Sequence, residues 1–187
     1  MIQDLPRIAS ALSRAVLWGA LWDACRDARL PAERYVDLVL RSVLPEASLA
    51  AVSNALGQAA TAIDSYAPVP VRAGLHDTWQ SGVRDLLYAA PAGSDHQLSL
   101  ARSFAGAAEP GWAADLLAGW LAGEQIPEGL LIDTDFRWSV VANLARLGRL
   151  DEADIEAELA RDSSITGAEQ AAGARAARPD PRAKADA

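Results

Sequence analysis

The sequence predicts an all-α protein, and three observations support that fold class. Apolar residues recur at intervals of three and four throughout the 187 residues, which places them along one side of a helix. Alternation of apolar and polar residues, the pattern of a strand, is nearly absent, and the strand-like run at 130–132 is too short to form a sheet. Proline, glycine and aspartate separate the periodic segments where helices begin and end.

Five periodic segments fill the first part of the chain. A first helix is expected to begin almost at Met1 and to carry a broad apolar face between Leu17 and Cys25, so we expect it to pack on two sides. Pro31 and Pro45 each suit the first turn of a helix, where the missing N–H of proline has no consequence. The other expected helices lie between Pro31 and Pro45, over 49–66, over 75–86 and over 100–108.

The second part of the chain continues the pattern. A helix is expected over 112–121, a longer connection over 123–133, and another helix over 138–145. Asp151 is expected to cap an eighth helix, and Thr166 with Glu169 has the capping-box spacing for a ninth. We interpret 1–187 as a single helical-repeat domain that is a fragment, with 179–187 as the start of a truncated last helix or a disordered tail.

The spacing of the helices favours one helical architecture. Pairs of helices recur about every 35–40 residues, the range of HEAT-type repeats, although no residue motif repeats with them. A bundle and a stack of helical hairpins are both compatible with helices of this length. Broad apolar faces favour the second, an α-solenoid of stacked antiparallel helix pairs of the HEAT or armadillo kind.

Composition excludes several functional classes. The net charge of −8 argues against a nucleic-acid partner, which requires a basic surface. A single cysteine, Cys25, excludes an internal disulfide framework and fits a reducing compartment. No segment reaches the length of a membrane span, and the apolar stretch at 15–22 lacks a cleavage site. We therefore expect a cytoplasmic protein with neither a nucleic-acid nor a membrane partner.

The sequence offers no recognisable catalytic centre. The two histidines, His76 and His96, are twenty positions apart, whereas a helical zinc site needs two at i and i+4. Cys25 lies among apolar residues, as an inert core thiol does. A nucleophile elbow and a phosphate-binding glycine loop are also missing from the sequence. We therefore expect no catalytic residue, no metal ligand and no cofactor in this chain.

One dense polar cluster remains, Asp133, Asp135 and Arg137. Two carboxylates so close together could perform acid–base chemistry if burial separated their pKa values. The interpretation we favour is that one of them caps a helix. Arg137 would then be a cation in a first turn, where the helix dipole disfavours it. An acidic neighbour, such as an upstream carboxylate, is expected to hold it.

Several segments together resemble the C-terminal helical domain of bacterial aminopeptidase N, a gluzincin zinc aminopeptidase. The resemblance covers nearly the whole chain, and its weight comes from the order and spacing of motifs that are weak singly. The segments are LWGALWDACRD at 17–27, YVDLVLR at 35–41, GSDHQL at 93–98, DTDFRW at 133–138, EAELARD at 156–162, TG at 166–167 and ARAARP at 174–179.

The resemblance implies a domain without its enzyme. The family's catalytic domain carries H-E-x-x-H, a downstream glutamate ligand and a G-x-M-E-N segment, none of which occurs here. Zinc would belong to the catalytic domain of the parent, which would also be this chain's partner in the same polypeptide. The helical domain would curve over the active site and shape a cavity for peptide substrates. Asp133, Asp135 and Arg137 are possible residues of the cavity wall, with Arg137 available to a peptide's C-terminal carboxylate.

Two alternatives remain open from the sequence. The chain could be an independent helical-repeat scaffold that binds a protein or peptide, which a stable monomer with a specific partner would indicate. It could also be a stand-alone enzyme that uses Asp133 and Asp135, which an assay of the purified chain would reveal. The reading frame upstream of the chain distinguishes both from the aminopeptidase interpretation, because that interpretation requires an in-frame H-E-x-x-H.

Overall fold

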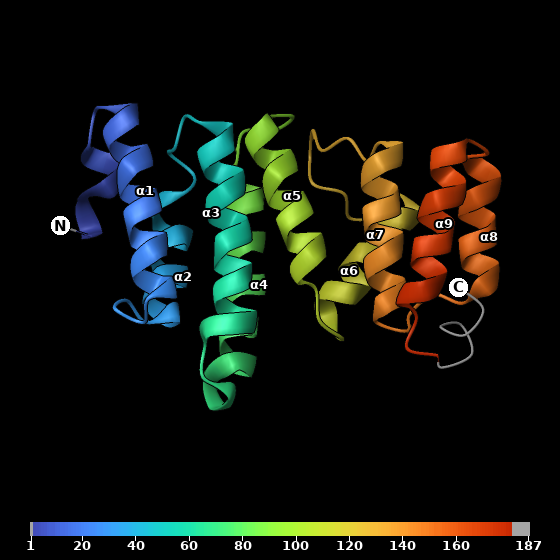
Figure 1. Cartoon of the computed structure of the whole chain (residues 1–187). Helices are drawn as coiled ribbons and strands as arrows, with labels where there is room; N and C mark the ends of the chain where they lie inside the picture. Colours follow the sequence, from blue (N-terminus) through green and yellow to red (C-terminus); the bar gives the residue numbers. More distant parts are fainter. Residues whose placement is uncertain (1, 181–187) are drawn as a thin grey trace. The chain divides into compact units, whose positions relative to one another are not determined.

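A computed structural model describes residues 2–180 of the chain (Figure 1). Within these residues it contains helices and connecting segments but no strand, so the predicted all-α class is confirmed. The 3₁₀-helical element η1 comes first, and a π-helical turn, η2, follows α3. The elements are η1 (Ile2–Arg7), α1 (Ala11–Arg26), α2 (Ala32–Ser42), α3 (Leu49–Thr61), η2 (Ala62–Tyr66), α4 (Val69–Ala89), α5 (Asp95–Ala107), α6 (Trp112–Ala122), α7 (Thr134–Arg146), α8 (Glu152–Arg161) and α9 (Ile165–Ala177).

Side-chain caps correct three of the expected helix starts. The first helix is interrupted rather than continuous from Met1, because Ser10 adopts an extended backbone and its Oγ caps α1. Pro45 lies before α3 and not in its first turn, since Ser48 is the residue that caps that helix. Ser164, rather than the Thr166 pattern, caps α9. In each case a hydroxyl oxygen accepts from an amide that has no partner inside the helix.

Contacts divide the chain into two units, Met1–Ala107 and Ala108–Ala187. In the first unit α1, α3 and α5 form one layer, in which α3 contacts both neighbours, while α2 and α4 form a second layer behind them (Figure 1). The two layers enclose an apolar core. Its fully buried members include Tyr35, Val36, Val39, Val52, Ala59, Ile63, Trp79, Val83, Leu87, Leu100 and Phe104.

The second unit is organised around α7, which contacts α6 and α9, while α8 packs on α9. A core of buried side chains from α7, α8 and α9 joins these three helices. It comprises Trp138, Val141, Ala145, Ile155, Ala171 and Ala174. In both units helix packs on helix, as in a helical-repeat domain.

The continuous solenoid over 1–187 stays a prediction. So does the interpretation of 179–187, because α9 ends at Ala177 and residues 181–187 lie outside the described range.

Candidate functional site

The polar segment 133–138 forms the start of α7, directly after the connection that follows α6. Asp133 is the N-cap of this helix, and its Oδ1 accepts a hydrogen bond from the backbone N–H of Phe136 at 2.8 Å. A carboxylate at this position satisfies an amide that would otherwise lack an acceptor, and it also suits the helix dipole. The sequence predicted that one of the two aspartates caps this helix, and the structure shows that it is Asp133.

Arg137 is held inside the second unit. Its Nε and Nη2 donate to the two carboxylate oxygens of Glu158, each at 2.7 Å, and Nη1 donates to the backbone oxygen of Leu121 at 3.3 Å. The Glu158 side chain is only 8% exposed. Its hydrogen bonds raise the pKa of the Arg137 guanidinium. An acidic neighbour does hold Arg137, but it lies downstream on α8 rather than upstream.

Asp135 differs from the other two members of the cluster. It lies in the first turn of α7, and its side chain is exposed. Among the residues that the structure describes, its carboxylate has no hydrogen-bond or ion-pair partner. Asp133 is exposed as well, so neither carboxylate has the apolar surroundings on which general acid catalysis by a carboxyl group depends.

A second polar contact ties α7 to the segment between α8 and α9. The indole Nε1 of Trp138, a residue that is 1% exposed, donates to Asp162 Oδ2 at 2.8 Å. Hydrogen bonds from Ser164 and from Trp138 lower the pKa of Asp162. Together with the Arg137–Glu158 pair, this contact fixes one side of α7 against the helices that follow it.

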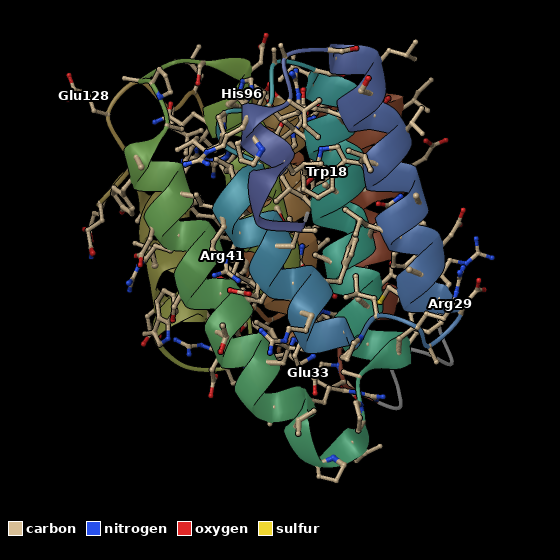
Figure 2. All side chains as sticks on the ribbon, turned by 90° about the vertical axis from the view of Figure 1, so that its left-hand side faces the viewer. Trp18, Arg29, Glu33, Arg41, His96 and Glu128 are labelled. Atoms are coloured by element: carbon tan, nitrogen blue, oxygen red, sulfur yellow. The ribbon has the colours of Figure 1, made fainter. Side chains whose placement is uncertain are left out.

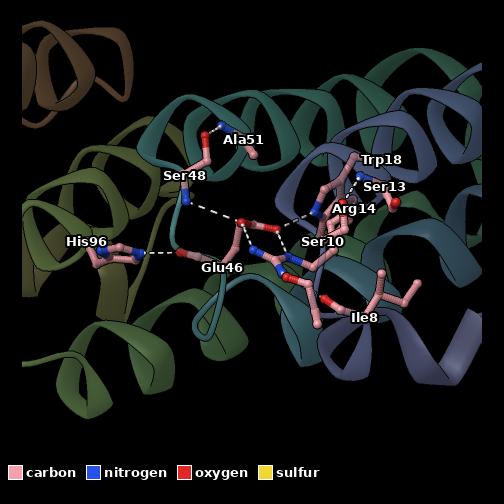
Figure 3. A network of polar contacts seen from close by, with 10 residues as sticks. Ile8, Ser10, Ser13, Arg14, Trp18, Glu46, Ser48, Ala51 and His96 are labelled. Carbon is pink, nitrogen blue, oxygen red and sulfur yellow. Dashed lines mark hydrogen bonds and ion pairs between the residues drawn. The ribbon is translucent and has the colours of Figure 1, made fainter.

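Sequence reasoning missed a polar network in the first unit, which is centred on Glu46 (Figure 3). The carboxylate is buried, and it accepts two hydrogen bonds from Arg14, each at 3.0 Å. It also accepts from Trp18 Nε1 at 3.4 Å and from the backbone N–H of Ser48 at 3.2 Å. His96 Nε2 lies 2.6 Å from the Glu46 carbonyl oxygen.

This network joins α1, the α2–α3 connection and α5 through one residue. The hydrogen bond from Arg14 is the largest influence on Glu46, and it lowers the pKa of the carboxyl group. Arg14 and Glu46 are 32 positions apart, so no local pattern could pair them. The one signal in the sequence was a lone acidic residue between two predicted apolar helices.

Residues 1–187 match the family described as the ERAP1-like C-terminal domain. The chain belongs to this family. A relative, Aminopeptidase N from Streptomyces lividans, is 42% identical over 185 residues, which are 99% of this chain and 22% of the relative. The chain thus spans about a fifth of the relative's length and is the C-terminal domain of an aminopeptidase N-like protein, as the sequence motifs predicted.

The histidines and the cysteine of this ERAP1-like C-terminal domain lie apart from one another. His76 Nε2 contacts Asp64 Oδ1 at 3.1 Å, whereas His96 belongs to the Glu46 network. Cys25 is buried, and burial raises the pKa of its thiol. Across residues 2–180, no three histidine, cysteine, aspartate or glutamate side chains gather in a way that could hold a metal ion. The described residues therefore do not fit a zinc site.

Hydropathy adds one finding about the helices of the ERAP1-like C-terminal domain. In the range that the structure describes, no helix combines the length and the apolar character that crossing a bilayer requires.

Proposed function

We propose that this chain is the C-terminal domain of a zinc aminopeptidase, in which it covers the active site and shapes the cavity that admits peptides. The observation that carries the proposal is 42% identity to Aminopeptidase N over nearly the whole chain. Because the described residues offer no metal site, the zinc would be bound by a catalytic domain in the remainder of the parent polypeptide. That catalytic domain would be the partner of this chain, and peptides would be its substrates.

The first experiment compares the chain with its parent. The 187-residue chain and the complete parent protein are purified and assayed with an amino-acid anilide and with short peptides. We expect zinc-dependent turnover from the parent and none from the chain, with or without added zinc. Turnover by the chain that survives repeated purification would favour the stand-alone enzyme. A parent without aminopeptidase activity would favour the independent scaffold.

The second experiment concerns the cavity wall, for which Asp133, Asp135 and Arg137 remain the candidates. Asp135 is the member best placed for substrate, because its side chain is exposed and unpaired among the described residues, whereas Asp133 caps α7 and Arg137 pairs with Glu158. Asp135→Asn in the parent is expected to raise KM for peptides several-fold and to spare a small anilide. It should leave the melting temperature unchanged.

Asp133→Asn is the matched control, because asparagine retains a capping oxygen and removes the same charge at a neighbouring position. It is expected to leave KM for both substrates unchanged. If Asp135→Asn also leaves the peptide KM unchanged, Asp135 has no part in the cavity wall.

A further inference from the structure

The outward side of the first half of α1 is apolar, whereas Asp23 and Arg26, which continue the same side of the helix, are exposed and pair with each other. Leu12 is 76% exposed and Val16 is 64% exposed, and the smaller residues Ala15, Gly19 and Ala20 on the same side of the helix are exposed too. Positions 12, 15, 16, 19 and 20 follow the i, i+3, i+4, i+7, i+8 spacing of one helical stripe. Trp18 and Cys25 occupy the opposite side and are buried. The first half of the helix is therefore apolar on both sides. We expected this helix to pack on two sides, but the residues that the structure describes cover only one of them.

The neighbouring helix in the same layer shows what a solvent-facing side of this unit normally contains. The exposed positions of α3 are mixed: Ser53, Asn54 and Thr61 are polar, whereas Leu49, Ala50 and Gly57 are not. Single exposed leucines are common on protein surfaces, but a continuous apolar stripe is characteristic of an interaction surface. α1 exposes two large apolar side chains on one stripe, Leu12 at 76% and Val16 at 64%, whereas α3 exposes one, Leu49 at 36%. This difference points to a partner for α1.

A groove along α2 provides the second observation. It has a volume of 590 Å³, and its lining includes Leu30 and Leu38 together with Arg34, Asp37 and Arg41. Arg41 pairs with Asp37. Arg34 is exposed and has no hydrogen-bond or ion-pair partner within the described part of the chain. The groove therefore combines apolar side chains with a free guanidinium group, a combination that suits an amphipathic segment with a carboxylate.

Figure 2 looks onto the first unit from the side on which α1 and α2 lie next to each other, with η1 in front of them. Because α1 contacts α2 and η1 contacts both helices, the helix with the apolar stripe and the helix with the groove are neighbours at the N-terminal end of the unit. A pair of helices laid against this end would continue the two layers, one helix on α1 and the other on α2.

We propose that the α1 stripe and the α2 groove dock a helical hairpin from the part of the parent polypeptide that lies outside this chain. The docked hairpin presents apolar side chains to Leu12 and Val16 and a carboxylate to Arg34. The inference rests on the proposed function, because it takes the chain to be one domain of a longer aminopeptidase N-like protein.

Two arguments favour this occupant over a second copy of the chain. The chain covers only 22% of its relative, so a large remainder of the same polypeptide would be tethered nearby, and tethering gives an effective concentration of the order of millimolar. Two copies would each carry a net charge of −8 and would repel one another.

The test measures whether the parent covers α1. Val16→Cys is introduced into the parent and into the 187-residue chain, and the rate of alkylation by N-ethylmaleimide is followed by mass spectrometry of the peptide that contains position 16. Val16 is largely exposed, so the substitution should not disturb folding. Asp77→Cys, at an exposed polar position on α4, is the matched control. The native Cys25 is buried and serves as the slow internal reference.

We expect alkylation at position 16 to be at least ten-fold slower in the parent than in the chain, relative to position 77. Adding Arg34→Glu to the parent should restore part of the lost rate and should change nothing in the isolated chain. Equal relative rates in parent and chain would overturn the proposal. So would concentration-dependent protection in the isolated chain, because that result indicates a second copy.

The same parent samples are assayed for aminopeptidase activity, which separates this inference from the proposed function. Activity without protection of position 16 means that the docking inference is wrong and the function stands. Protection without activity means that the hairpin docks but the parent is not an aminopeptidase.

Discussion

Two arginine–glutamate pairs illustrate how single residues connect distant segments of this chain. Arg14 with Glu46 ties α1 to the α2–α3 connection, and Arg137 with Glu158 ties α7 to α8. Both glutamates are buried, and both arginines bind them with two hydrogen bonds. Removing one partner of such a pair leaves a buried charge without compensation, which costs more than the pair itself contributes.

Arg137→Ala is expected to lower the free energy of unfolding by about 3 kcal/mol, because Glu158 would stay buried with its charge unpaired. Urea denaturation of the 187-residue chain measures the change. The control is Arg29→Ala, which removes an exposed arginine paired with Asp27 and is expected to cost less than about 1 kcal/mol. Similar losses from the two variants would contradict the prediction.

Glu46 makes stability depend on pH. The hydrogen bonds from Arg14 and other donors lower its folded-state pKa below the ordinary value of 4.5. The resulting stabilisation is therefore complete above the unfolded-state pKa and is lost as the pH falls through the folded-state pKa. Glu46→Gln is expected to be less stable than the native chain at neutral pH and to lose less stability between about pH 5 and pH 3.

Melting temperatures measured across this range test the prediction on Glu46. Glu124→Gln, at an exposed position, is the matched control and should follow the native profile. If the profile of Glu46→Gln is as steep as that of the control, another group is responsible for the acid dependence.

At the scale of elements, the connections are as specific as the helices. The α8 helix begins with a capping box in which Asp151 and Asp154 each accept from the other's backbone N–H. The segment that leads from α8 to α9 passes very close to the first turn of α9. A Cβ atom on Gly167 would lie 2.1 Å from the backbone oxygen of Asp162, a separation that a methyl group cannot occupy.

Gly167→Ala is expected to destabilise the chain by about 2 kcal/mol or more, because the backbone around Asp162 would have to move and its contact with Trp138 would weaken. Gly173→Ala on the same helix is the matched control, since a Cβ there meets nothing within 4 Å. It should stabilise the chain by up to about 1 kcal/mol through helix propensity. Chemical denaturation of both variants measures the difference, and a stabilising effect of Gly167→Ala would refute the argument.

At the scale of the whole molecule, the chain should fold without a metal ion. Its far-UV circular dichroism spectrum is expected to be that of a helical protein, and its melting temperature should not change when EDTA is added. The reason is that buried apolar side chains form the core of each unit, while the described residues bring no set of metal ligands together. A melting temperature that falls on chelation would contradict this prediction.

The sequence by itself determined the fold class, the approximate place of each helix and the family. Helical periodicity depends on neighbours three and four positions apart, so it can be read from the chain. The cap at Asp151, and a cap at either Asp133 or Asp135, follow from equally local chemistry. Where several residues compete to begin a helix, as with Ser164 and Thr166, the backbone conformation decides, and the local pattern was insufficient.

Only the tertiary structure decided which distant residues meet. It paired Arg137 with Glu158 across 21 positions and Arg14 with Glu46 across 32. Among residues 2–180, it left the outward side of the first half of α1 uncovered. These outcomes depend on how helices pack, and a periodic pattern records that a face is apolar without recording what covers it. The packing of the helices also decides which charged side chains find partners. The carboxylate of Asp135 is unpaired among the described residues, while Asp133, two positions away, caps a helix.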